Sequence, residues 1–151
     1  AKVISKAILH KARSRAKLRS EITIHSTLAH PCVVKFERCF EDDHNIYIVL
    51  ELCAQQTLAE LLKARKHLTE AEVAKYLRQA VTGLQHLHAR GIIHRDLKLG
   101  NLFLSSRGAL KIGDFGLACK LAYEGERKTT MCGTPNYIAP EVLCSPVGHS
   151  F

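Results

Sequence analysis

The chain has 151 residues, with 22 Lys and Arg against 14 Asp and Glu, which gives a formal net charge of +8 at pH 7. Its longest fully apolar runs, such as residues 46–50, are far shorter than the ~20 residues of a membrane-spanning helix, so we exclude a protein built on such helices. The six cysteines form no C-x-x-C pair, and the 151 residues contain no recognisable secretory signal. We therefore expect reduced thiols and a cytosolic or nuclear setting.

Residues 2–19 carry seven basic residues and no acidic one. We interpret the run as a solvated helix face rather than a nuclear-localisation patch. The positive charge alone would fit a nucleic acid, a membrane surface, or ATP and acidic proteins. Because no aromatic residues interleave the basic ones and no nucleic-acid motif is present, we favour the last of these and expect neither nucleic acid nor membrane as a partner.

A helix is predicted from Leu18 onward, with Leu18, Ile22 and Leu28 on one apolar stripe, until Pro31 ends it. Residues 33–40 and 46–50 follow as two predicted strands joined by an acidic turn.

Two further helices are then predicted, each opened by a capping box. The boxes are Thr57 with Glu60 and Thr69 with Glu72. The second helix has apolar residues at helical spacing up to residue 90, where Gly91 is expected at its C′ position. We expect it to be the central buried helix of this half of the chain.

Residues 102–104 and 110–112 are two short apolar runs separated by a turn that contains glycine, a pattern that predicts a β-hairpin. Antiparallel pairing is expected to set Asn101 opposite Ile112. Asp114 then lies beside Asn101 and close to Asp96. Three oxygen-bearing side chains therefore converge at one end of the hairpin.

The chemistry of these side chains favours phosphoryl transfer. Asn101 and Asp114 offer the oxygen ligands that Mg²⁺ prefers in combination with substrate phosphates. Asp96, without a metal to bind, could accept a proton from an attacking hydroxyl. Lys98 would point the same way as Asp96 and offset charge on a transferring phosphoryl group.

Three motifs resemble those of eukaryotic protein kinases and occur in the kinase order. They are His94–Asn101, Asp114–Gly116 and Ala139–Glu141. Several stretches across the whole chain are further similar to the polo-like family of Ser/Thr protein kinases, the pair Leu99-Gly100 before Asn101 being the most discriminating.

The resemblance implies an α+β, bilobal protein-kinase fold that is incomplete. Residues 1–50 would be the rest of the small lobe, 51–56 the hinge, and 57–151 the first part of the large lobe. No G-x-G-x-x-G is present, so the strands of the glycine-rich loop are expected to be missing, as are the last helices of the large lobe. In such a fragment, apolar surfaces on the helix over residues 70–90 would face solvent. We therefore expect it to be prone to aggregation and nearly inactive by itself.

The resemblance also implies a nucleotide site. Lys2 would contact the ATP phosphates and be held by Glu21 from the neighbouring helix. The backbone of Glu51 and Cys53 would bind the adenine edge. Two apolar side chains would complete this set: Leu50 as gatekeeper, and Phe103.

A regulatory segment is implied after Gly116. Thr130 would be the activating phosphosite, preferred over its neighbour Thr129, and an upstream kinase would modify it. Arg95 would bind the phosphate. Thr134 would hydrogen-bond to Asp96 and Lys98, and Lys98 argues for Ser/Thr rather than Tyr specificity.

By resemblance, the parent protein would be an ATP- and Mg²⁺-dependent Ser/Thr kinase acting in mitosis, in the cytoplasm and nucleus and at the centrosome or spindle. Its partners would be ATP, Ser/Thr-containing proteins and, through polo-box modules elsewhere, phosphorylated proteins. A pseudokinase or regulatory binding module remains open, since the glycine-rich loop is absent, as does an inactive fragment. A DNA-binding role rests on the charge alone.

Overall fold

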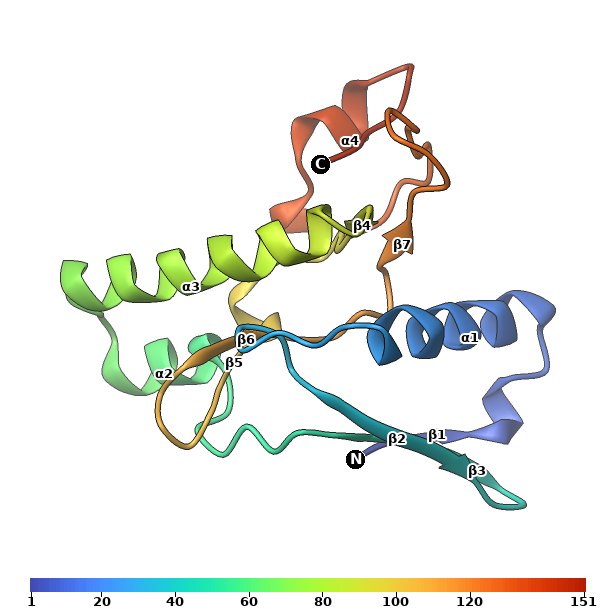
Figure 1. The fold of residues 1–151 in the computed structure, drawn as a ribbon, viewed down its shortest axis with the longest axis horizontal. Helices are drawn as coiled ribbons and strands as arrows, with labels where there is room; N and C mark the ends of the chain where they lie inside the picture. The colour runs from blue at the N-terminus through green and yellow to red at the C-terminus, as the bar shows by residue number, and fades with distance from the viewer.

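The computed structural model describes all 151 residues, which form an N-terminal sheet with one helix and a larger part with three helices and small β elements (Figure 1). The strands and the helix of the first part are β1 (Lys2–Ser5), α1 (Ala12–Ser26), β2 (Phe36–Glu41) and β3 (Asn45–Leu50), with a 3-10 turn at Lys6–Ile8. This mixture of segregated sheet and helices is the expected α+β class.

The second part follows a connecting stretch after β3. Its helices are α2 (Leu58–Arg65), α3 (Glu70–His88) and α4 (Pro140–Cys144). Its strands are β4 (Ile92–Ile93), β5 (Leu102–Leu104), β6 (Leu110–Ile112) and β7 (Cys119–Lys120). It also contains two 3-10 turns, η2 (Leu99–Asn101) and η3 (Pro135–Tyr137). None of the helices is both long enough and apolar enough to cross a bilayer.

The N-terminal sheet is antiparallel, in the order β1-β3-β2. The predicted strand over residues 33–40 was placed too early, because β2 begins only at Phe36. The preceding residues pair with β6 instead: the amide of Val34 donates to the carbonyl oxygen of Ile112 at 2.9 Å, and the amide of Ile112 donates to Cys32 at 2.8 Å. This segment therefore ties the sheet to the hairpin that carries the candidate site.

Both predicted capping boxes are present, at Thr57 and Thr69. Helix α3 ends at His88 with Ala89 as its C-cap, so Gly91, with φ of 67°, lies one residue beyond the C′ position at which it was expected. One face of α3 packs on β6 so closely that a Cβ on Gly83 would lie 2.8 Å from the Ile112 side chain.

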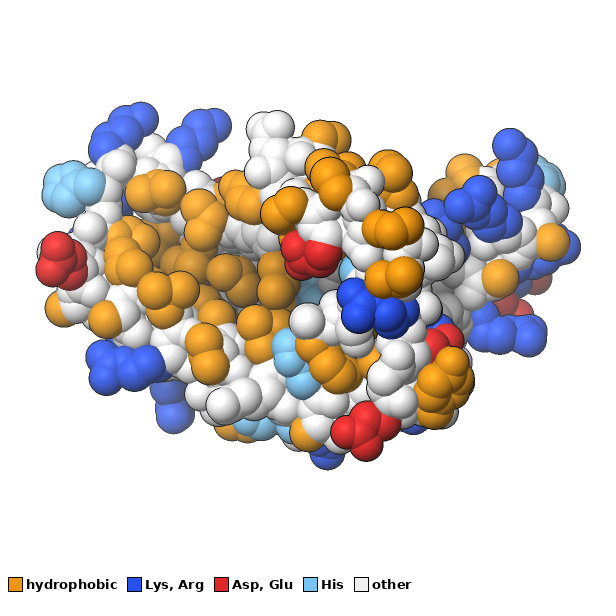
Figure 2. All heavy atoms as spheres, turned by 90° about the horizontal axis from the view of Figure 1, so that it is seen from above, with side chains coloured by type: hydrophobic (Ala, Val, Ile, Leu, Met, Phe, Trp, Pro, Cys, Tyr) orange, Lys and Arg blue, Asp and Glu red, His pale blue; other side chains and the backbone are white.

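The opposite face of α3 is open, and its apolar side chains face solvent as predicted. Val73, Leu77 and Val81 are 41%, 59% and 51% exposed. Figure 2 shows hydrophobic side chains gathered in a hollow along this face. Such a patch favours association with other apolar surfaces.

The main hydrophobic core joins both parts of the molecule. It contains the end of α1, the segment after it, α3 and the hairpin, in eleven buried residues: Ile24, Leu28, Val33, Leu58, Leu87, Ile92, Leu104, Leu110, Ile112, Phe115 and Ala118. A smaller cluster of Leu9, Leu18 and Ile48 lies between α1 and the sheet. The hairpin is thus anchored in densely packed surroundings, which keep side chains at its end in fixed positions.

Candidate active site

The predicted hairpin forms, but its register differs by one residue from the expectation. Leu102 pairs with Ile112, and Asn101 lies in the 3-10 turn that precedes β5. The backbone carbonyl of Asn101 accepts a 3.0 Å hydrogen bond from the amide of Gly113. Asn101 is therefore opposite Gly113, one residue before Asp114, because the 3-10 turn delays the start of the strand.

Asp96 is held by three side chains. Its Oδ1 accepts the hydroxyl of Thr134 at 2.6 Å. Its Oδ2 accepts the ammonium of Lys98 at 2.9 Å and the amide Nδ2 of Asn101 at 3.0 Å. Burial opposes ionisation of this carboxyl, yet the hydrogen bonds from Thr134 and Lys98 outweigh it and lower the pKa of Asp96.

Lys98 and Thr134 also contact each other, with the lysine Nζ donating to the threonine Oγ1 at 2.6 Å. The contacts of Thr134 with Asp96 and Lys98 that the family resemblance implied are therefore present, and the ion pair between Lys98 and Asp96 is added to them. The bond from Asn101 to Asp96 was not predicted, because only a metal-binding role had been considered for that amide.

Two residues of the site have left-handed backbone conformations. Arg95 has φ of 66° and Asp114 has φ of 57°. A non-glycine residue in this region costs on the order of 1–3 kcal/mol and persists where the surroundings determine it. Here the buried side chains of His94, next to Arg95, and Phe115, next to Asp114, fix the two loops. The side chain of Asp114 itself is 45% exposed.

Lys2 connects the sheet to α1 and to the hairpin. Its Nζ lies 2.7 Å from Glu21 Oε1 and 3.5 Å from Asp114 Oδ1. Partial burial lowers the pKa of Lys2, but the hydrogen bond and charge of Glu21, followed by Asp114, outweigh it and raise that pKa. An ammonium held in this way stays charged and faces the same space as Asp114.

This space is a cleft of about 380 Å³ between the sheet and the hairpin. It collects residues from both parts of the chain: Ala1, Lys2, Glu21, His25, Val34, Leu50, Glu51, Leu52, Asn101, Phe103, Gly113 and Asp114. Phe103 packs so closely on Gly113 that a Cβ there would lie 2.7 Å from the ring. Of the predicted nucleotide-binding residues, Cys53 is half-buried and is not among the residues that line the cleft.

The cleft's oxygen donors fit a magnesium ion. Asn101 uses its amide nitrogen on Asp96, so its amide oxygen is left for another partner. The second oxygen of Asp114, Oδ2, makes no hydrogen bond or ion pair. No group of three His, Cys, Asp or Glu side chains gathers as a metal site. An amide and a carboxylate that need phosphate oxygens to complete the coordination match the preference of Mg²⁺.

A column of aromatic rings supports Asp114 from behind. Phe115 is fully buried and lies between His25 of α1, at 4.6 Å between ring centroids, and His94, at 5.2 Å. His25 Nε2 lies 2.7 Å from the carbonyl oxygen of Val34. No role for His25 was predicted from the sequence; its only signal is its position three residues after Ile22 on the apolar stripe.

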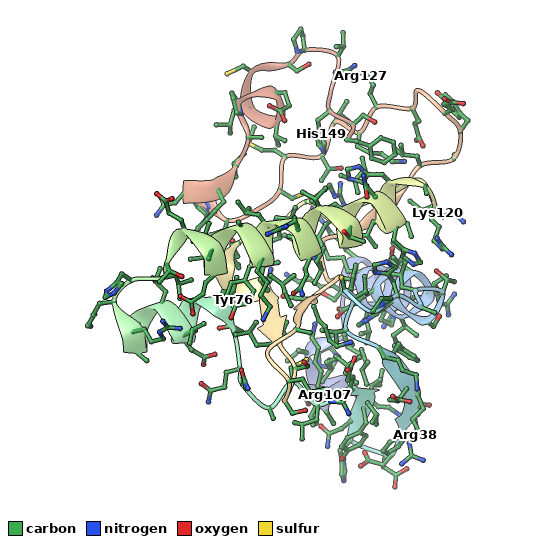
Figure 3. All side chains as sticks on the ribbon, turned by 60° about the vertical axis from the view of Figure 1, so that its left-hand side comes forward. Arg38, Tyr76, Arg107, Lys120, Arg127 and His149 are labelled. Carbon is green, nitrogen blue, oxygen red and sulfur yellow. The ribbon has the colours of Figure 1, made fainter.

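The segment that contains Thr130 runs beside the C-terminal residues. Lys128 and His149 form an antiparallel bridge, and Arg127 donates to the carbonyl oxygen of Gly148 at 3.1 Å. Figure 3 shows Arg127 and His149 in this upper part of the molecule, away from the sheet. Thr130 is exposed, and Arg95 is half-buried with its Nε donating to the carbonyl oxygen of Leu117 at 2.7 Å.

Comparison with known proteins gives a consistent result. The sequence matches the protein kinase domain family over residues 1–150. It is 57% identical over 150 residues to the probable serine/threonine-protein kinase CCRP1 of Zea mays, covering 99% of this chain and 24% of that protein. The serine/threonine-protein kinase polo of Drosophila melanogaster is 56% identical over 150 residues, covering 99% and 26%. The cell cycle serine/threonine-protein kinase CDC5/MSD2 of Saccharomyces cerevisiae is 56% identical over 152 residues, covering 100% and 22%.

The chain thus spans about a quarter of the length of the curated relatives it matches. The match to the kinase domain family nevertheless extends over almost all of its residues, and its α+β fold is part of the kinase fold. With more than half of its residues identical to those relatives, the chain belongs to the polo-like serine/threonine kinases of the protein kinase family.

Proposed function

We propose that the protein containing this chain transfers the γ-phosphate of ATP to Ser or Thr hydroxyls of proteins, with Mg²⁺ as cofactor. The observation that carries the proposal is the arrangement around Asp96. An ionised carboxylate, a lysine and a threonine hydroxyl contact one another within 2.9 Å beside a cleft that contains Lys2 and Asp114. Phosphoryl transfer depends on this kind of positioning and charge.

In the proposed nucleotide complex, the cleft would receive ATP between the sheet and the hairpin. Lys2, fixed by Glu21, would bind phosphate oxygens as a charged donor. The backbone of Glu51 and Cys53 would contact the adenine edge, with Leu50 and Phe103 providing apolar surface.

Asn101 and Asp114 would hold Mg²⁺, which when bound neutralises developing charge on the phosphate oxygens. The chain's own groups then orient the acceptor. Because the pKa of Asp96 is lowered, its carboxylate is a weak base that orients the substrate hydroxyl more than it removes the proton. Lys98, 2.9 Å away, would stabilise the negative charge of the transferring group.

Regulation at Thr130 is part of the proposal. The residue is exposed and follows Arg127 and Lys128, so a modifying kinase could reach it. A phosphate there adds about −1.5 to −2 charge. Arg95, which precedes Asp96 directly, would pair with it and couple the order of the segment to the active site.

We extend the proposal to a role in cell-cycle control in the cytoplasm and nucleus, including the centrosome or spindle. The yeast relative is named a cell cycle kinase, which supports the role in cell-cycle control. Six free cysteine thiols suit a reducing compartment.

The test is phosphate transfer from radiolabelled ATP to a Ser/Thr-containing protein such as casein, by the protein from which this chain comes. Transfer that requires Mg²⁺ and is lost in Asp96→Asn is expected. Binding of ATP without transfer under activating conditions, including Thr130→Glu, would instead identify a pseudokinase.

A further inference from the structure

A largely buried lysine outside the loop of residues 94–101 joins three segments of the chain. The side chain of Lys111, in β6, is 12% exposed, and its Nζ lies 3.0 Å from Oε2 of Glu51. The same nitrogen donates to the carbonyl oxygen of Pro31 at 3.0 Å. The stretch after β3, the turn after α1 and the hairpin therefore meet at one ammonium group.

Glu51 is held on its other side by the backbone that leads into β2. Its Oε2 accepts the amide of Lys35 at 3.1 Å, and its own amide donates to the carbonyl oxygen of Lys35 at 2.9 Å. Glu51 also lines the cleft, and Leu52 after it is 83% exposed. The lysine contact thus connects an otherwise open stretch of chain to the core hairpin.

The later part of this connecting stretch has its own anchors. Gln55 donates its amide to the carbonyl oxygen of Leu104 at 3.2 Å, and the amide of Leu104 donates to Gln56 at 2.8 Å. Residues 51–53, whose backbone is proposed to contact the adenine edge, precede these backbone bonds and begin at Glu51. Their position relative to the hairpin is set at one end by β5 and at the other by the side chain of Lys111.

We propose that Lys111 is a positioning residue that fixes residues 51–53 for nucleotide binding, acting through the carboxylate of Glu51 and the carbonyl of Pro31. The inference rests on the proposed ATP site. Lys111 itself does not line the cleft. Removing the ammonium would leave the Glu51 carboxylate, whose side chain is 28% exposed, and the Pro31 carbonyl without their lysine partner, which loosens the stretch rather than residues 94–101.

The consequence is a specific kinetic signature. A binding segment that is already ordered adds little entropic cost when a ligand arrives, whereas a loosened segment must be ordered at that moment. Lys111→Met is therefore expected to raise the dissociation constant and KM for ATP about threefold to tenfold. The value of kcat should stay within about twofold, since Asp96, Lys98 and Asp114 keep their contacts.

The experiment compares Lys111→Met, Glu51→Gln and the double variant in the protein that contains this chain. Amide hydrogen exchange, followed by mass spectrometry, should accelerate over residues 51–53 in Lys111→Met. If Lys111 acts through Glu51, the double variant should be little weaker in ATP binding than Glu51→Gln alone. The matched control is Lys6→Met, which removes an exposed ion pair with Glu41 (36% and 63% exposed) and should change neither exchange nor KM.

Unchanged exchange over residues 51–53 in a folded Lys111→Met variant would overturn the inference, as would a fall in kcat with KM unchanged. Should that variant unfold, Glu51→Gln, which preserves side-chain size, carries the same exchange measurement. The exchange result does not need ATP to bind. Failure of the wild-type protein to bind ATP would therefore contradict the proposed function while the positioning role is still tested.

Discussion

Replacing Asp96 by Asn tests the assignment of roles within the site. The change preserves size and removes one negative charge from a side chain that is 10% exposed and bonded to Lys98, Thr134 and Asn101. An amide oxygen can still accept from Thr134, so the loop should keep its shape. What is lost is the ionised group that orients the acceptor hydroxyl.

The size of the effect follows from that loss. Proton-transfer assistance and orientation by a carboxylate contribute roughly 10²–10⁴ in rate, so kcat should fall by that factor. The dissociation constant for ATP should change by less than about threefold, since Asp96 is not among the residues that line the nucleotide cleft.

The assay pairs steady-state phosphate transfer with calorimetric ATP binding. Asp42→Asn is the matched control: Asp42 is also hydrogen-bonded, with its pKa lowered by Tyr47 and backbone amides, but it lies in the exposed turn between β2 and β3. Its kcat should be unaffected. A parallel loss of binding and turnover in Asp96→Asn would refute the division between acceptor orientation and nucleotide binding.

Three other changes probe the supporting structure. Lys2→Met removes the charged donor beside Glu21 and should weaken ATP binding about tenfold to a hundredfold by calorimetry; a change below threefold would exclude a phosphate contact. Thr69→Ala removes the capping box of α3 and should lower the free energy of unfolding by about 1 kcal/mol in a urea titration, with kcat unchanged; an unshifted midpoint would contradict it. His25 and His94 are buried with lowered pKa values, so the unfolded state binds more protons below about pH 6.5, and stability should fall as the pH drops from 7 toward 5. Substituting both by Phe should flatten that dependence in thermal melts, and an unaltered slope would exclude these two groups as its source.

Local patterns in the sequence were sufficient to predict several parts of the fold. Both capping boxes and the hairpin over residues 102–112 formed because each depends on residues within a few positions of one another. The contact of Lys2 with Glu21 was predicted only from family resemblance, since 19 residues separate them and no local rule links them.

The boundary and register errors arose where the backbone makes hydrogen bonds other than those that the apolar pattern indicates. Residues 33–35 look like the start of a strand, yet Val34 bonds to Ile112, far along the chain, and β2 starts later. The register at Asn101 shifted because a 3-10 turn takes up that residue before the strand begins. The exposed face of α3 was predicted, but from the family resemblance and not from its spacing, because periodicity does not reveal what covers a helix.

The contacts of His25 and Lys111 with distant residues could not be predicted from the sequence either. From the sequence alone, His25 looks like an ordinary helix residue and Lys111 like a surface charge. His25 packs against the ring of Phe115, and Lys111 pairs with Glu51. Both partners are far away in the sequence and are brought close only by tertiary packing.

The most direct test of the account is calorimetric titration of the protein that contains this chain with ATP, in the presence and absence of Mg²⁺. The account predicts that Mg²⁺ strengthens ATP binding in the wild type and in Asp96→Asn, and that Asp114→Asn loses this dependence together with phosphate transfer. Mg²⁺-dependent ATP binding that survives intact in Asp114→Asn would contradict the assignment of the cation to the end of the hairpin.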